Sequence, residues 1–290
     1  MRTDLALEQH ENLVGEIKGV SKEELTLGKA KITKIGVLDE EGEKAIGKPK
    51  GNYITIEVEP FSQSQDYGDG RQEAISQEIA NMLPKEGTIL IAGIGNSDIT
   101  PDALGPKTAR GILATRHISK EFAQSLGLGE LRSVATISTG VLGKTGMETA
   151  EILKGIVENI KPSAVIVIDA LASRSLSRLG CTVQISDTGI SPGSGVGNSR
   201  SEISEKTLGV PVIAIGVPTV VDAVTLASDI MNSEGNNEVN EKISPRGEQM
   251  MVTPRDVDLM INNASSLVSL SINRALHPHI SNEDMLTLVS

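Results

Sequence analysis

The feature that most constrains this fold is a regular alternation of short apolar runs and helix-forming segments between residues 88 and 231. The apolar runs have the length and composition of buried strands, at 88–92, 132–138, 164–168, 181–186 and 212–215. Apolar spacing and capping signals predict helices at 101–117, 145–160 and 219–231. Strands that alternate with helices form a parallel sheet covered on both faces. We therefore predict an α/β protein, a three-layer α/β/α sandwich with a mostly parallel sheet.

The segments on either side of this region extend the same architecture. Strands are expected at 29–38 and 52–58, and helices at 71–83 and from 253 to about 276. Polar residues dominate 232–247, which we interpret as a variable loop. Neither an internal repeat nor a linker composition interrupts the chain before residue 232, so the 290 residues are expected to form one domain.

Charge and composition argue against several classes of function. The formal net charge is −11, which disfavours a nucleic-acid partner because phosphate binding needs clustered positive charge. The single cysteine, Cys181, permits no internal disulfide and fits a reducing compartment. The charged N-terminus has no apolar signal region, and no apolar run approaches the length of a membrane span. We expect a cytoplasmic protein without a membrane partner.

Two acids carry the strongest chemical signal. Asp169 directly follows the apolar run 164–168, and Asp102 lies shortly after the run 88–92. In open α/β sheets the carboxyl ends of the strands form the ligand crevice, so both acids meet there if the two strands are neighbours. Two carboxyl groups in close proximity resist ionising together, and one keeps its proton. The pair then supplies a base that activates water and an acid that protonates a leaving group.

Two glycine-rich stretches accompany these acids at strand ends. The first, after 88–92, suits a tight turn where the backbone approaches a ligand. The second, 187–198, also follows a predicted strand, and we interpret it as a crevice wall or a lid over substrate. The residues assigned to the substrate crevice are Gly93, Gly95, Asn96, Gly189, Gly193 and Gly195.

Two other functions stay open at this point. Residues 138–145 resemble a P-loop with Ser138 in place of its first glycine and Lys144 as its lysine, which would make the chain a nucleotide-binding regulatory protein. A metal-dependent hydrolase in the same crevice is the other alternative. The four histidines, His10, His117, His277 and His279, lack the spacing of a zinc motif, so we expect neither a metal nor another cofactor.

Several long blocks of the chain carry a family resemblance. Residues 93–106 (GIGNSDITPDALGP), 167–175 (VIDALASRS), 184–198 (QISDTGISPGSGVGN) and 211–223 (PVIAIGVPTVVDA) resemble the spore germination proteases of endospore-forming Firmicutes. The resemblance implies an endopeptidase that begins the degradation of small acid-soluble spore proteins during germination. It also implies an atypical aspartic peptidase, once classed among metallopeptidases, whose two essential aspartates match Asp102 and Asp169. The implied fold is related to the hydrogenase maturation proteases.

The same resemblance implies self-processing. Members of the family are zymogens that trim their own N-terminus, and their substrates are cut after the acidic residue of a motif like T-E-F-A-S-E. Residues 3–8 (TDLALE) imitate that motif. The implied cut lies between Asp4 and Leu5, which makes 1–4 a pro-segment and 5–290 the protease domain. A homotetramer in the spore core is also implied.

Overall fold

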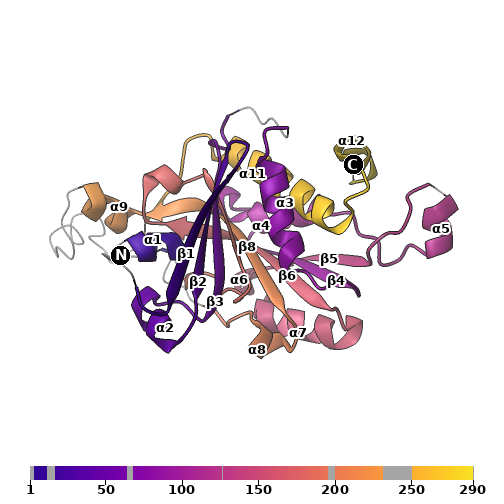
Figure 1. Ribbon diagram of the computed structural model, residues 1–290, viewed down its shortest axis with the longest axis horizontal. Coiled ribbons are helices and arrows are strands. Elements are labelled where there is room, and N and C mark those ends of the chain that lie inside the picture. The colour runs from indigo at the N-terminus through magenta and orange to yellow at the C-terminus, as the bar shows by residue number, and fades with distance from the viewer. Residues whose placement is uncertain are drawn as a thin grey trace.

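The computed structural model describes residues 3–11, 17–63, 68–125, 127–194, 200–230 and 250–289 (Figure 1). In this part of the chain the strands form one nine-stranded sheet in the order β1-β2-β3-β7-β8-β6-β4-β5, with β9 paired to β8. The strands are β1 (Val20–Leu27), β2 (Ala30–Val37), β3 (Gly51–Glu57), β4 (Ile89–Ile94), β5 (Val134–Gly140), β6 (Ala164–Ser173), β7 (Thr182–Ser186), β8 (Val212–Asp222) and β9 (Met251–Val252).

The helices lie on both faces of this sheet. They are α1 (Ala6–Glu11), α2 (Glu40–Ile46), α3 (Arg71–Met82), α4 (Leu104–Arg110), α5 (Lys120–Ser125), α6 (Leu142–Thr145), α7 (Thr149–Ile160), α8 (Glu205–Leu208), α9 (Ala223–Ile230), α11 (Val257–Leu276) and α12 (Asn282–Val289). Two 3-10 turns, η1 (Thr100–Asp102) and η2 (Leu176–Arg178), complete the described elements.

The sheet has a parallel half and an antiparallel half. β5, β4, β6 and β8 are mutually parallel neighbours, as the alternation of strands and helices predicts. On the other side of β8, the strands β7, β3, β2 and β1 pair in antiparallel fashion. β1 and β3 therefore run in the direction of the parallel strands, whereas β2, β7 and β9 oppose it. The predicted α/β class is confirmed.

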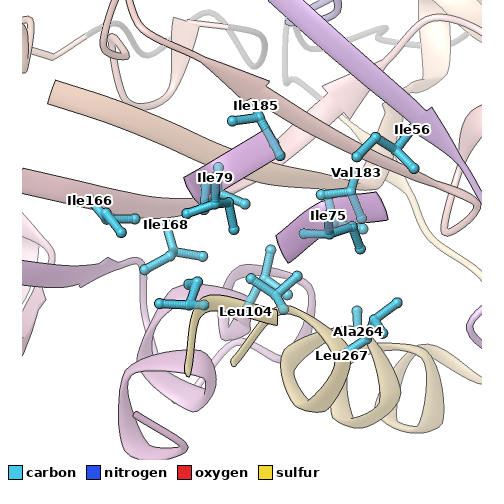
Figure 2. Packing of buried hydrophobic residues seen from close by; sticks show 14 of the residues in the cluster. Ile56, Ile75, Ile79, Leu104, Ile166, Ile168, Val183, Ile185, Ala264 and Leu267 are labelled. Carbon is cyan, nitrogen blue, oxygen red and sulfur yellow. The ribbon is translucent and has the colours of Figure 1, made fainter. Parts of the chain in front are cut away.

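Two apolar layers separate the sheet from its helices. One face packs against α3, α4 and α11, and Figure 2 shows Ile75 and Ile79 of α3 and Leu104 of α4 against isoleucines of the sheet. The other face packs against Leu153 and Val157 of α7 and Leu208 of α8. Near the N-terminus, α1 and α2 cover β2 and β3. Aliphatic side chains build nearly all of this interior, which gives the predicted three layers.

Several predicted boundaries are wrong, and hydrogen bonding explains the differences. β6 and β8 continue as a parallel pair as far as Ser173 and Val221, so the expected helix at 219–231 begins only at Ala223. The expected helix 101–117 is shorter: η1 comes first, and α4 starts after Ala103 rather than after Thr100. The expected helix 145–160 is divided into α6 and α7 by Gly146, whose φ is +71°.

Candidate active site

A cavity of about 430 Å³ lies at the carboxyl ends of the parallel strands, and three aspartates from separate segments line it. Asp169 belongs to β6, Asp102 ends η1 after β4, and Asp4 belongs to the N-terminal segment. β4 and β6 are hydrogen-bonded neighbours with Gly93 opposite Ile168, which fulfils the condition under which the two acids were expected to meet. This adjacency brings Asp102 and Asp169 to one cavity from positions 67 residues apart in the chain.

A tight turn after β4 fixes Asp102. Gly95 has a φ of +121°, a conformation that L side chains rarely adopt. The turn directs the backbone N–H of Asn96 to Asp102 Oδ2, at 2.8 Å. Burial raises the pKa of Asp102 above its ordinary value, and the Asn96 hydrogen bond opposes that rise. The Asn96 N–H therefore supports the ionised form of Asp102.

Asp169 lies deeper in the protein and is only 5 % exposed. Its Oδ1 accepts a hydrogen bond from the N–H of Ala170 at 2.9 Å. The pKa of Asp169 is raised well above its ordinary range, first by burial, then by the charge of Asp102 and then by that of Asp4. The site thus holds one carboxyl group that keeps its proton and one that is more readily ionised, the division of roles that acid-base catalysis requires.

Asp4 lies against the edge of β6 next to this pair. Its N–H donates to the carbonyl of Ala172 at 2.9 Å, and its Oδ2 accepts from the N–H of Ala172 at 2.9 Å. Its Oδ1 accepts from the hydroxyl of Ser194, also at 2.9 Å. The carboxylate of Asp4 is therefore recognised by two neutral donors, while one backbone hydrogen bond ties Asp4 to β6.

The residues after Asp4 are anchored as firmly. Leu5, Ala6 and Leu7 are buried, and Glu8 is 3 % exposed. The Glu8 carboxylate accepts from the N–H groups of Arg174 and Ser175, at 2.8 and 3.0 Å, and lies 3.7 Å from the Arg178 guanidinium. The segment that imitates a substrate motif is thus fixed at both of its acidic residues.

The other predicted crevice residues have different positions. Gly95 and Gly193 line the main cavity, and Gly189 lines a second cavity of about 310 Å³ that shares Asp4 with the first. Gly93 lines neither of the two: a side chain there would collide with Gly105 and Ala109, so its role is the close approach of α4 to β4. Gly195 lies outside the described residues.

The two alternative chemistries find little support in the geometry. Lys144, the lysine of the P-loop resemblance, is ion-paired with Asp98, so its charge is already balanced by a carboxylate. Residues 142–145 form a helix of a single turn rather than the long helix that follows a P-loop. Across the described ranges, no three His, Cys, Asp or Glu side chains are grouped closely enough to hold a metal ion.

Three side chains that contact Asp4 were not predicted. Ser194 lies within the glycine-rich stretch that was assigned to the crevice, so the stretch was identified but the residue was not. Gln184 is a buried polar residue of β7, all of whose residues are buried, and a long polar side chain in such a strand is a usable signal. Lys48 lies in a short polar connection between α2 and β3, where nothing in the local sequence distinguishes it.

The fold and the site together define an α/β protein whose acid-lined cavity receives a polypeptide segment, which is the arrangement of a peptide hydrolase. Comparison with known families agrees. The family model described as germination protease matches residues 2–234 and 230–288. The chain therefore belongs to the germination protease family, and it is a peptidase of that family.

Curated relatives cover the whole chain. A germination protease from Caldanaerobacter subterraneus subsp. tengcongensis is 46% identical, over 100% of this chain and 98% of the relative. One from Clostridium tetani is 44% identical, over 98% of each chain. Among solved structures, a NiFe hydrogenase maturation protease, HycI, from Thermococcus kodakarensis KOD1 is similar with a TM-score of 0.37 and 15% identity, over 67% of this chain and 98% of that one.

No helix in the described ranges is long and apolar enough to span a bilayer.

Proposed function

We propose that this chain is a self-processing endopeptidase that cleaves after acidic residues, with Asp102 and Asp169 as its acid-base pair. The observation that carries the proposal is the position of Asp4. This residue lines the same cavity as the two acids, and its carboxylate has its own donors in Ala172 and Ser194. This shared cavity supports the peptide bond that follows Asp4 as the bond that the pair cleaves.

The chemistry follows from the protonation of the two acids. The Asp102 carboxylate takes a proton from water, and the resulting hydroxide attacks the carbonyl carbon of Asp4. Asp169, protonated because it is buried beside two other acids, gives its proton to the nitrogen of Leu5 as the C–N bond breaks. The products are the Asp4 carboxyl group and the Leu5 amine. Proton exchange with solvent returns Asp102 and Asp169 to their starting states.

The substrates we propose are the small acid-soluble spore proteins that coat DNA in the dormant spore. Family membership supports this assignment, and so does a site built around an acidic residue before the scissile bond. The net charge of −11 fits a protease that handles DNA-coating proteins without itself binding DNA. We further propose that the enzyme is made as a zymogen in the spore compartment and assembles as a homotetramer.

Mutation of the pair tests the mechanism. Full-length Asp102→Asn and Asp169→Asn should each lose self-trimming and the cleavage of a peptide that contains Thr-Asp-Leu-Ala-Leu-Glu. Mass spectrometry would follow the loss of residues 1–4 and locate the cut in the peptide. Asp258→Asn is the matched control, because Asp258 is exposed in the first turn of α11. Wild-type trimming by Asp169→Asn, or a cut at another bond, would refute the proposal.

A further inference from the structure

Two side chains outside the acid pair converge on the carbonyl oxygen of Asp4, the oxygen of the proposed scissile bond. Lys48 Nζ donates to it at 3.1 Å, and Gln184 Nε2 donates to it at 3.4 Å. Lys48 comes from the α2–β3 connection and Gln184 from β7, so the chain brings them together from positions 136 residues apart.

The nitrogen of the same peptide bond is also held. The N–H of Leu5 donates to Thr3 Oγ1 at 3.0 Å. With the oxygen bound by Lys48 and Gln184 and the N–H bound by Thr3, the plane of the Asp4–Leu5 peptide is fixed. A peptide plane fixed beside the acid pair speeds the reaction because the reacting groups are already held in position.

The surroundings of Lys48 make its contact with the carbonyl stronger than a surface contact. Lys48 and Gln184 line the second cavity, which meets the main cavity at Asp4. Gln184 is 8 % exposed, and burial lowers the pKa of the Lys48 ammonium while the charge of Asp4 opposes that effect. A partly desolvated donor interacts more strongly with a developing charge than a hydrated donor does.

When water attacks the Asp4 carbonyl, negative charge develops on the oxygen that these two groups already touch. We propose that Lys48, assisted by Gln184, is a catalytic residue that stabilises this oxyanion. The inference rests on the proposed endopeptidase function and adds a third role to it. Donors fixed on the carbonyl oxygen leave Asp102 to activate the water and Asp169 to protonate the leaving nitrogen. The cavity acids then need not bind the oxygen themselves.

The main test replaces the ammonium in the full-length protein. Loss of one fixed oxyanion donor typically costs about 10²–10³ in kcat, so Lys48→Met should slow self-trimming by roughly that factor. Lys48→Arg, which keeps a cationic donor, should recover part of the rate. Lys50→Met is the matched control, because Lys50 is exposed two positions further along and its side chain has no part in the site. Thermal unfolding of each variant checks the fold.

A positioning role gives a different kinetic result. With the Thr-Asp-Leu-Ala-Leu-Glu peptide as substrate, an oxyanion donor lowers kcat with little change in KM, whereas an anchoring residue raises KM at constant kcat. A ¹³C carbonyl on Asp4 itself, introduced by semisynthesis into the full-length, inactive Asp169→Asn protein that keeps residues 1–4, adds a spectroscopic readout. There, Lys48→Met should raise the infrared frequency of the labelled carbonyl. If Lys48→Met unfolds, Gln184→Met tests the same oxyanion site with a smaller expected loss.

The outcomes separate the two proposals. Active Asp169→Asn overturns the endopeptidase mechanism, whatever Lys48 does. Inactive Asp169→Asn together with a wild-type kcat in Lys48→Met overturns the oxyanion role alone, as does a change confined to KM. Loss of kcat in Lys48→Met and Gln184→Met, with Lys50→Met unchanged, supports it.

Discussion

The turn at Gly95 offers the most exacting test of how the site is built. A Cβ placed on Gly95 would collide with the backbone carbonyl of Asp102 and would lie 3.2 Å from its Oδ1. The Cβ would lie 2.1 Å from the Asp102 carbonyl oxygen, so the Asp102 backbone has to retreat by more than 1 Å to reach ordinary van der Waals contact at 3.4 Å. The φ of +121° at this position adds strain to any residue with a side chain. Gly95→Ala therefore perturbs one catalytic acid without changing its chemistry.

The expected magnitude follows from this displacement. A shift of about 1 Å in a catalytic group costs on the order of 10²-fold in rate, so kcat should fall roughly 100-fold in Gly95→Ala. The strained backbone conformation should also lower the free energy of unfolding by about 1–3 kcal/mol. Substrate contacts at Asp4 involve Ala172 and Ser194 rather than this turn, so KM should change little.

Peptide cleavage and urea unfolding measure these two effects separately. Gly155→Ala is the matched control: the position lies inside α7, and a Cβ there meets nothing within 4 Å. It should keep the wild-type kcat and gain about 0.5–1 kcal/mol of stability. A folded Gly95→Ala with wild-type kcat would show that the position of Asp102 does not control the reaction, and the reasoning would fail.

Three further predictions concern other parts of the molecule. His277 is fully buried, and burial lowers its pKa from 6.5 to about 4. As the pH falls, the unfolded chain therefore takes up the proton before the folded protein does. The free energy of unfolding is highest above pH 6.5 and falls by about 3 kcal/mol towards pH 4. Urea unfolding across this range should show that slope in wild type, and an equal slope in His277→Gln would contradict it. Asp69 and Arg71 form a buried ion pair with 2.6 Å between Oδ2 and Nε, and Arg71→Met should lower the free energy of unfolding by about 3–5 kcal/mol because it leaves the carboxylate without its cation. Adding Asp69→Asn should restore part of that loss, and unchanged stability in Arg71→Met would argue against the pair. Ser194→Ala removes a hydrogen bond to the Asp4 carboxylate, so KM should rise about tenfold for a peptide with Asp before the scissile bond but not for one with Asn; equal changes for both peptides would exclude this role.

The sequence predicts the parallel half of the sheet well because local composition determines it. The run 164–168 is apolar on both faces, which is the signature of a central parallel strand, and the acid after it identifies the crevice. The end of β6 was missed for a non-local reason: residues 170–173 remain in the strand because β8 continues beside them. β1 was missed because it is an edge strand with mostly exposed residues, so it lacks an apolar pattern.

The residues of the candidate site also differ in how well the sequence predicts them. Asp102 follows β4, and Asp169 directly follows the apolar run of β6, so a shared crevice was predictable once these two strands are neighbours. The contacts of Asp4 with Lys48 and Gln184 depend on the path of the N-terminal segment over the sheet, which no local pattern encodes. The motif at 3–8 gave the one indication, and only as a resemblance to substrates.

The way in which Asp4 is recognised follows from its neighbours. A site that selects an acidic residue beside an acid pair has to bind a carboxylate without removing the proton from Asp169. A cation at the Asp4 carboxylate would stabilise negative charge nearby and lower the pKa of Asp169. Neutral donors, the Ala172 N–H and the Ser194 hydroxyl, bind the carboxylate and leave its charge in place, and that charge helps to raise the pKa of Asp169. The nearby Lys48 ammonium donates to the backbone carbonyl of Asp4 rather than to its carboxylate, and the Arg178 guanidinium lies at Glu8, four residues further along the segment. In the proposed mechanism, the acidic residue before the scissile bond is thus both what the site recognises and part of what keeps Asp169 protonated.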